Sequence, residues 1–186
     1  MAIGSTTHTF DIELSHVDRG VYETFSVKTG RHPSESAEYL VTRILAYTLE
    51  YEEGIAFTQG LAASDEPAVW VRDLTGQLVA WIEVGTPDPA RLHRAAKAAE
   101  RVVVYCHKDP DAWLKTLAGH PVHGADRIGI VTVPRALVQS LVAVLDRRTR
   151  LCVSVNDGDL YVDTGGEPIA ARLERVGYPS SGGRAG

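Results

Sequence analysis

The chain has 186 residues, of which 44% are hydrophobic and 23% charged, and its formal net charge is −5. This length suits one ordinary domain with a buried core, and the composition is that of a globular protein rather than a disordered or fibrous one. The negative charge argues against a protein that coats nucleic acid through many Lys and Arg contacts to phosphates, although it leaves room for an enzyme with a local basic groove.

The first half of the chain alternates strand and helix patterns. Two alternating apolar stretches around Gly20 predict an opening β-hairpin. Ser34 or Ser36 can cap a helix whose apolar residues recur at helical spacing. The clearest hairpin follows, where AVWVR and LVAWIEV flank a turn at 73–77. The predicted elements are strands at 7–16 and 22–29, a helix at 35–51, a short segment at 55–59 and strands at 68–72 and 78–84.

The second half predicts a parallel crossover. The sequence GTPDP ends the hairpin and begins a helix, and VVVYC then has the pattern of a buried strand. Strand, helix and strand in this order imply a right-handed connection between parallel strands. The predicted elements are helices at 89–101, 111–117 and 134–145, and strands at 102–106, 128–133, 150–156, 159–164 and 168–174.

These elements predict one compact α/β domain over residues 1–178, with a single mixed β-sheet, flanking helices and a disordered tail at 179–186. No apolar run approaches the roughly 20 residues that cross a bilayer, and residues 1–9 lack a signal-peptide pattern. Cys106 and Cys152 lie in strand-like stretches, so we expect free thiols, with one disulfide as the alternative. We therefore expect a cytoplasmic monomer that does not enter a membrane.

Glu83 is the chemically most suggestive residue. It lies near the end of LVAWIEV, a run that is otherwise almost wholly apolar. A carboxylate there is costly unless it is paired, protonated, metal-bound or directed into a cleft. Hairpin pairing places Ala68 or Pro67 opposite Glu83, with Asp65 and Glu66 nearby. The alternative to a functional site is a salt-bridged Glu at the strand end.

The predicted helix after Glu83 has one basic face. Arg91, Arg94, Lys97 and Arg101 recur at helical spacing, opposite a face of small apolar residues. Such a face is commonly no more than a solvated surface. Beside an acidic strand end, however, cations can hold a phosphate and stabilise charge in a transition state.

Three segments resemble the YaeQ family: RHPSESAEYLVTRILAY, DEPAVWVRDLTGQLVAWIEVGTPD and ARLHRAAK. The resemblance covers nearly the whole chain. That family is similar to the restriction-endonuclease-like PD-(D/E)XK superfamily, as a compact variant of its fold. The resemblance implies that Glu83 is the acid of the (D/E)XK element and that Glu38 is a supporting acid in the first helix. In active nucleases of this type, clustered carboxylates bind one or two Mg²⁺ ions and a Lys helps to activate water.

The resemblance implies a Mg²⁺ or Mn²⁺ site and no organic cofactor. Two motif positions differ: Gly85 replaces the Lys, and Ala68 replaces the acid after Pro67. Arg94 or Lys97 could replace the missing Lys in space, although Arg is a poor proton acceptor. The implied metal ligands are Glu83, Asp65, Glu66 and Glu38. The implied catalytic residues are Glu83, Glu66, Lys97 and Arg94, and the cleft residues are Arg31 and Arg91. Arg31 can equally pair with Glu35 or another nearby acid.

Three functions follow as hypotheses. The first is a metal-dependent phosphodiesterase acting on nucleic acid, in which Glu83→Gln abolishes metal binding. The second is a catalytically degenerate nuclease fold that binds a nucleic acid or a protein partner, as Ala68 and Gly85 suggest. The third is a structural or interaction role, in which the carboxylates form salt bridges with Arg31 and Arg94. A likeness of fold does not decide among them.

Overall fold

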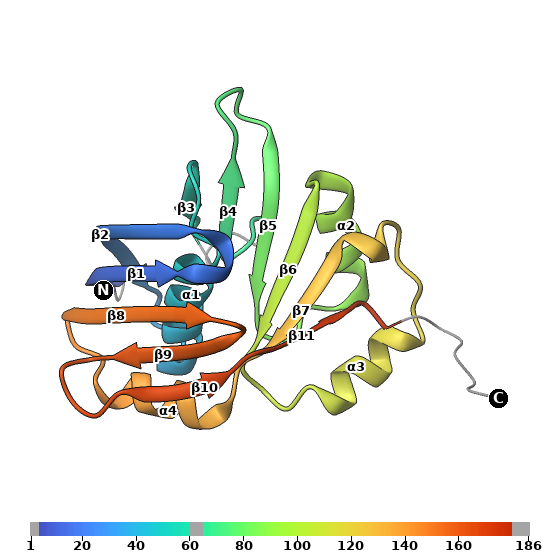
Figure 1. Ribbon diagram of the computed structural model, residues 1–186. Helices are drawn as coiled ribbons and strands as arrows, with labels where there is room; N and C mark the ends of the chain where they lie inside the picture. The colour runs from blue at the N-terminus through green and yellow to red at the C-terminus, as the bar shows by residue number, and fades with distance from the viewer. Residues whose placement is uncertain (1–3, 60–64, 180–186) are drawn as a thin grey trace.

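The computed structural model describes residues 4–59 and 65–179, and within them the chain forms two mixed sheets and four α-helices (Figure 1). The prediction of an α/β fold is confirmed, but the prediction of one sheet is wrong. Sequence patterns identify strands without identifying their partners, and here the closing strands pair with the opening hairpin instead of extending the central sheet. Of the predicted tail, only Pro179 lies within the described residues.

The first sheet joins the two ends of the chain. Its opening hairpin is antiparallel, as predicted, with a short 3₁₀ turn, η1 (Val17–Arg19), between its strands. β1 also pairs in parallel with β8, so that Thr9 lies opposite Arg148. The spatial order of the strands is β10 (Ile169–Arg172), β9 (Asp159–Asp163), β8 (Arg148–Asn156), β1 (Thr6–His16) and β2 (Val21–Arg31).

The second sheet contains the predicted hairpin and crossover. β4 and β5 are antiparallel, and β5, β6 and β7 run parallel. The predicted strand at 168–174 is split, because its last residue starts β11, which pairs with β7 in this other sheet. The spatial order is β11 (Glu174–Gly177), β7 (Ile128–Thr132), β6 (Arg101–Cys106), β5 (Leu78–Val84), β4 (Val69–Arg72) and β3 (Ile55–Phe57).

The four helices begin and end close to their predicted bounds. Ser36 caps the first, because its hydroxyl accepts a hydrogen bond from the Tyr39 amide at 3.1 Å. Asp88 caps the second in the same way, with Pro89 in the first turn. The second helix stops before Arg101, which instead begins β6. The helices are α1 (Ala37–Leu49), α2 (Pro89–Ala98), α3 (Asp111–Ala118) and α4 (Arg135–Ala143); a 3₁₀ turn, η3 (Ala125–Arg127), precedes β7.

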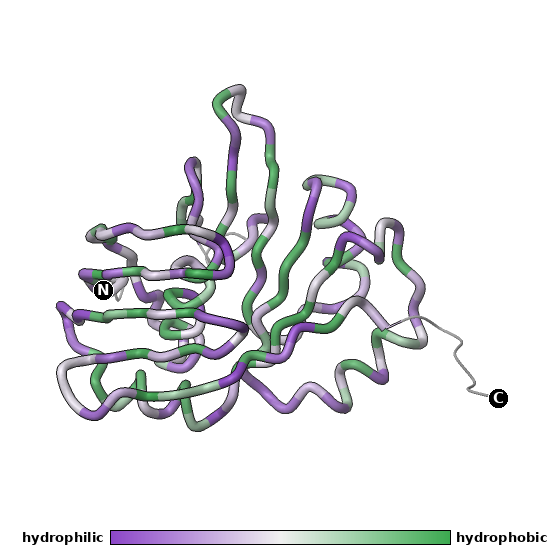
Figure 2. The backbone as a smooth tube through the Cα atoms, viewed as in Figure 1, coloured by the Kyte–Doolittle hydropathy of each residue, from purple (hydrophilic) through white to green (hydrophobic). Residues whose placement is uncertain are grey.

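The main core lies between the two sheets and encloses α1. Residues 40–49 of α1 are all buried, which explains why this helix is apolar on nearly all sides. A second core lies on the other face of the β5–β6–β7 sheet, where Leu92, Ala95 and Ala96 of α2 pack. Hydrophobic residues are accordingly dense along β5 and β6 (Figure 2). Cys106 and Cys152 are both free thiols, as predicted.

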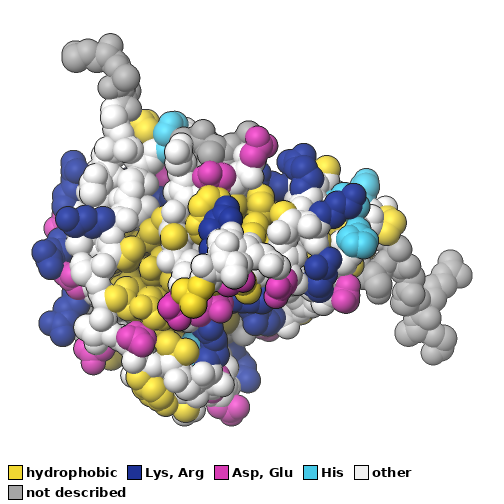
Figure 3. Space-filling view, turned by 90° about the horizontal axis from the view of Figure 1, so that it is seen from above, with side chains coloured by type: hydrophobic (Ala, Val, Ile, Leu, Met, Phe, Trp, Pro, Cys, Tyr) yellow, Lys and Arg dark blue, Asp and Glu magenta, His cyan; other side chains and the backbone are white. Residues whose placement is uncertain are grey.

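The surface is charged but mixed in sign. Seen from above, Lys and Arg side chains alternate with Asp and Glu around an apolar patch, without forming one broad basic face (Figure 3). On this face, basic groups are local, as the negative net charge predicts. In the described parts of the chain, no helix has the length and apolarity needed to span a membrane.

Candidate functional site

A cleft of about 610 Å³ opens at the carboxyl ends of β5 and β6, and we call it the Glu83 cleft. Parallel strands that end side by side are a common place for ligands in α/β folds. The first turns of α1 and α2 border the cleft. Its lining includes Ser36, Tyr39, Glu66, Ala68, Glu83, Gly85, Arg91, His107 and Lys108.

The β4–β5 pairing ends with Val69 opposite Ile82, and this register, if continued, has Ala68 opposite Glu83, one of the two predicted pairings. At Ala68 the pairing becomes irregular, because the Ala68 backbone amide donates to the Ile82 carbonyl at 3.1 Å. The turn at 73–77 by itself would favour Pro67, but a bulge between Val71 and Arg72 shifts the register by one residue. Ala68 packs in the main core, and its methyl group supplies no carboxylate beside Glu83.

Glu83 is almost completely buried, with 3% of its surface exposed. Its Oε1 accepts two hydrogen bonds of 2.6 Å, one from Trp81 Nε1 and one from Arg91 Nε. Trp81 and Glu83 share a face because they are two residues apart in a strand. Burial raises the pKa of Glu83, and Arg91 and Trp81 only partly offset this rise. Glu83 is thus a paired carboxylate whose charge is incompletely stabilised.

Arg91 connects Glu83 to the cleft edge. The cap of α2 fixes its backbone, because the Arg91 amide donates to Asp88 Oδ1 at 2.7 Å. Its Nη2 donates to the Glu66 carbonyl at 2.6 Å, and its guanidinium lies 5.9 Å from the Trp81 ring. Its side chain is 22% exposed, so the guanidinium stands between a buried carboxylate and the open cleft.

The other predicted residues are distributed unevenly. Glu66 lines the cleft, where its carboxylate accepts a hydrogen bond from the Gln59 amide at 3.3 Å. Asp65 is exposed and outside the cleft lining. Arg94 and Lys97 lie on the exposed face of α2, also outside that lining. The structure therefore brings together Glu83, Glu66 and Arg91 from the predicted set.

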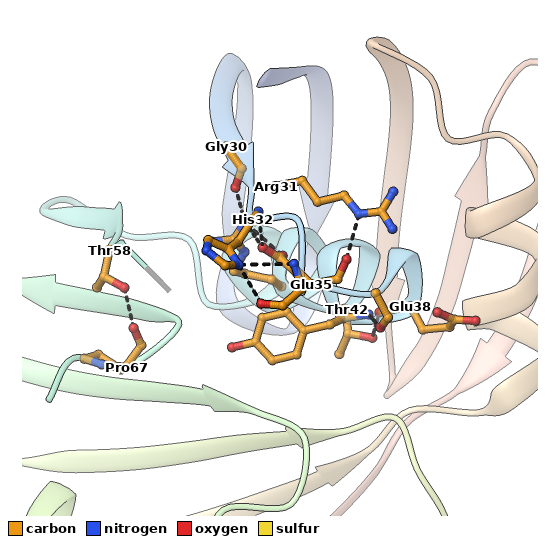
Figure 4. A network of polar contacts seen from close by, with 12 residues as sticks. Gly30, Arg31, His32, Glu35, Glu38, Thr42, Thr58 and Pro67 are labelled. Carbon is orange, nitrogen blue, oxygen red and sulfur yellow. Dashed lines mark hydrogen bonds and ion pairs between the residues drawn. The ribbon is translucent and has the colours of Figure 1, made fainter. Parts of the chain in front are cut away.

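Arg31 and Glu38 belong to the surroundings of the first turn of α1. Arg31 Nε donates to the backbone carbonyl of Glu35 at 2.9 Å (Figure 4). The Glu35 carboxylate itself pairs with Arg43 at 3.0 Å, and both side chains are at most 2% exposed. The Glu38 carboxylate points away from Pro67 and lines a neighbouring cavity. Arg31 therefore contacts Glu35, the partner named in the alternative prediction, but it binds the backbone carbonyl and not the carboxylate.

Tyr39 and Lys108 are among the lining residues that the sequence analysis did not assign to the site. Burial, and then the nearby charge of Glu83, raise the pKa of Tyr39 to about 12, so a neutral phenol lines the cleft. Lys108 is exposed and has no ion-pair partner within residues 4–59 and 65–179. Lys108 follows the end of β6, which lies beside β5. The crossover predicted from the sequence already places these two strand ends together, so Lys108 could have been expected near Glu83.

The donor set does not fit a resident metal ion. Among the described residues, no group of three or more His, Cys, Asp or Glu side chains is placed to hold one. Two carboxylates line the Glu83 cleft, and Oε1 of Glu83 is already engaged by two donors. Ala68 has no ligand atom in its side chain, and Gly85 has no side chain.

Gly85, where the resemblance implied a Lys, has a backbone conformation that favours glycine. Its φ is +98°, a conformation that residues with a Cβ adopt only with strain. Space is not the obstacle, because a Cβ added there meets no atom within 4 Å. The backbone that turns from β5 toward α2 therefore favours glycine at this position.

Comparisons with known proteins agree over the length of the chain. The model of the YaeQ protein family matches residues 1–173. The uncharacterized protein YaeQ of Escherichia coli K12 is 27% identical over 182 residues, covering 97% of this chain and 100% of that protein. The crystal structure of YaeQ protein from Pseudomonas syringae has a TM-score of 0.84 at 31% identity, covering 92% and 96%. That from Xanthomonas axonopodis pv. citri has a TM-score of 0.82 at 27% identity, covering 95% and 99%. The chain therefore belongs to the YaeQ family.

Proposed function

We propose that the protein is a nuclease-like binding module whose Glu83 cleft holds the phosphate backbone of a nucleic acid without a resident metal ion. The fold that we infer is a compact variant of the PD-(D/E)XK core. It is supported by the β4–β5 hairpin, which places Glu83 at the cleft edge, and by the helix and parallel strand that follow. The differences at Ala68 and Gly85 support binding rather than hydrolysis.

The observation that carries this proposal is the pair between Glu83 and Arg91. The carboxylate that would bind a metal ion instead positions a guanidinium at the cleft wall, through the 2.6 Å contact from Nε. A guanidinium is planar, permanently charged and suited to two-point contacts with phosphate oxygens. Because Glu83 and the Glu66 carbonyl orient Arg91 in advance, less side-chain freedom is lost when a phosphate binds.

Lys108 supplies the second cation. It lines the same cleft as Arg91 and follows the end of β6, the strand beside β5. Two cations that flank a cleft can contact one phosphate or two successive phosphates of a chain. Contacts of this kind add affinity without sequence preference.

The test is the affinity of the full chain for a short fluorescein-labelled single-stranded DNA, measured by fluorescence anisotropy in EDTA over a series of salt concentrations. We expect binding in EDTA, and we expect Lys108→Gln to weaken it and to lower the salt slope by about one. Lys115→Gln is the matched control, because Lys115 is exposed on α3, outside the Glu83 cleft. Equal affinities of the two variants, or no binding in EDTA, would contradict the proposal.

Metal-dependent hydrolysis of a phosphodiester is the second candidate. It is favoured by one observation, namely that the cleft brings Glu66, Glu83 and Lys108 together. The same labelled DNA, incubated with Mg²⁺ or Mn²⁺ and analysed on a denaturing gel, distinguishes the two. Cleavage that EDTA and Glu83→Gln both abolish would establish the second candidate and displace the first.

A further inference from the structure

A second cavity, of about 620 Å³, lies where the two sheets meet, and we call it the junction cavity. Its volume is typical of small-molecule sites, which occupy roughly 300–1,000 Å³. It is at the opposite end of α1 from the Glu83 cleft: Ser36 borders that cleft, whereas Leu49 and Glu50 line the junction cavity. The 13 residues of α1 span about 20 Å, so the two cavities are separate.

One part of the wall is apolar. Val131 of β7, Val155 of β8 and Leu160 of β9 line the junction cavity, and each is buried in the fold. These residues come from both sheets, so the apolar surface exists only once the sheets have packed together. A ligand that matches this surface has an apolar body.

The main carboxylate on the wall is already neutralised within the protein. Glu50 Oε1 accepts hydrogen bonds from the Tyr105 hydroxyl and from Arg175, each at 2.8 Å, and Oε2 accepts one from Arg101. Burial alone raises the pKa of Glu50, but Arg101 and Arg175 outweigh it, so the pKa falls below its ordinary value. Glu50 is therefore a stable anion with its oxygens engaged.

The other acids on the wall are engaged as well. Asp18 accepts hydrogen bonds from the backbone amides of Asp157 and Gly158, at 2.7 and 3.0 Å. Glu52 forms an ion pair with Arg101. Each acid thus has a donor from the protein, and the cavity has little carboxylate capacity left to hold a cation.

The guanidinium groups, in contrast, keep donors for a ligand. Each Arg side chain carries five N–H groups in a planar fork. In the described parts of the chain, Arg19 donates one hydrogen bond, of 2.7 Å, to the Leu49 carbonyl, and Arg175 donates one, to Glu50. The Arg175 side chain is 57% exposed, so its remaining N–H groups are accessible. Engaged acids beside accessible guanidiniums favour an anionic ligand.

His16 adds a polar group that lacks a partner. Only 9% of its surface is exposed, and its Nδ1 has no hydrogen-bond partner among residues 4–59 and 65–179. Burial, and then the charge of Arg19, lower the pKa of His16, so its ring is neutral at pH 7. A buried polar group without a protein partner is uncommon in folded proteins, so this nitrogen is available to water or to a polar group of a ligand. His16 lines the junction cavity, where a ligand can reach it.

We propose that the junction cavity binds a small organic acid, whose carboxylate contacts Arg19 and Arg175 and whose apolar body lies against Val131, Val155 and Leu160. This site shares no lining residue with the Glu83 cleft. The proposal for the junction cavity is therefore independent of the function proposed for the Glu83 cleft.

The test uses benzoate as the probe, titrated into the ¹⁵N-labelled full chain and followed by NMR. Acetate, which lacks the apolar body, and benzyl alcohol, which lacks the charge, are the matched controls. We expect benzoate to shift the amide signals of Asp157 and Gly158 and the Arg19 side-chain signal in a saturable manner. We expect both controls to bind at least about tenfold more weakly, since a tenfold change corresponds to the loss of about one good contact.

Arg19→Gln and Arg175→Gln are each expected to weaken benzoate binding about tenfold, whereas Lys108→Gln, at the other cavity, leaves it unchanged. Thermal unfolding shows whether each variant is folded, and the wild-type titration decides the matter even if a variant is not. Three results overturn the proposal: shifts that do not saturate, shifts that map away from the junction cavity, or equal binding of benzyl alcohol.

Discussion

Glu83 and Glu50 are two carboxylates buried to a similar degree, 3% and 5% exposed, in opposite electrostatic surroundings. Burial is the largest influence on both. Glu83 has Arg91 and the Trp81 indole as donors, and its pKa remains raised. Glu50 has two arginines and a tyrosine hydroxyl, and its pKa is lowered. Burial alone therefore does not determine whether the pKa of a carboxyl group rises or falls; the number and charge of its partners decide it.

The two surroundings also differ in where the partners come from. The donors to Glu50 belong to β6 and β11, so this carboxylate ties the end of α1 to two strands of the second sheet. The donors to Glu83 lie within ten residues of it, on β5 and α2. Glu50 consequently connects elements that are distant in the sequence. Glu83 instead positions the nearby Arg91 in one wall of the cleft.

The largest effect is expected from removing Glu50. Glu50→Ala leaves the buried Tyr105 hydroxyl and the partly exposed Arg101 and Arg175 without their shared acceptor, at a cost of about 2–4 kcal/mol. Glu83→Ala should cost less, about 1–2 kcal/mol, because burial already disfavours the charged form of Glu83, whereas the partners of Glu50 favour its charged form. Urea unfolding of both variants measures the difference. Equal losses would remove the distinction between the two carboxylates.

The next effect concerns the partner of Glu83. Arg91→Gln removes one of the two donors to Glu83 Oε1 and leaves the Trp81 indole. We expect the free energy of unfolding to fall by about 1–3 kcal/mol at pH 7. Arg94→Gln, one turn further along α2 and exposed, is the matched control and should stay within about 0.5 kcal/mol of wild type. If Arg91→Gln is as mild as the control, the pair does not stabilise the fold, and Glu83 is less dependent on Arg91 than its geometry suggests.

A smaller effect is expected at Gly85. Gly85→Ala should lower the free energy of unfolding by about 1–2 kcal/mol, because its φ of +98° is unfavourable for any residue with a Cβ. Gly166→Ala is the control, since a Cβ there also meets no atom within 4 Å and Gly166 lacks a positive φ. Equal stabilities in thermal unfolding would show that strain does not explain the absence of the motif Lys.

The smallest effect is the pH dependence, where the two carboxylates should have opposite signs. Because the pKa of Glu83 is raised, wild type should lose stability relative to Glu83→Gln as the pH rises from 4.5 through the raised pKa. Because the pKa of Glu50 is lowered, wild type should lose stability relative to Glu50→Gln as the pH falls below 4.5. Urea unfolding across this range measures both slopes, and slopes of the same sign would contradict the comparison.

Local patterns in the sequence were sufficient for most of the elements and for identifying Glu83 as a residue in need of partners. The alternation in AVWVR and LVAWIEV predicts the hairpin, and Ser34 or Ser36 and the sequence GTPDP predict the starts of α1 and α2. Glu83 is conspicuous because a carboxylate in an apolar strand needs a compensating partner. These inferences succeed because strand alternation, helix capping and desolvation each depend on residues close together in the chain.

Only the tertiary structure decided how those elements combine. The pairing of β1 with β8 creates a second sheet, and it depends on contacts between residues more than 100 positions apart. Likewise, Arg91 rather than Arg94 or Lys97 reaches Glu83, and Lys108 enters the cleft from the neighbouring strand. Side chains on one basic helix face look equivalent in the sequence, whereas the packing angle of the helix on the sheet determines which one meets the carboxylate.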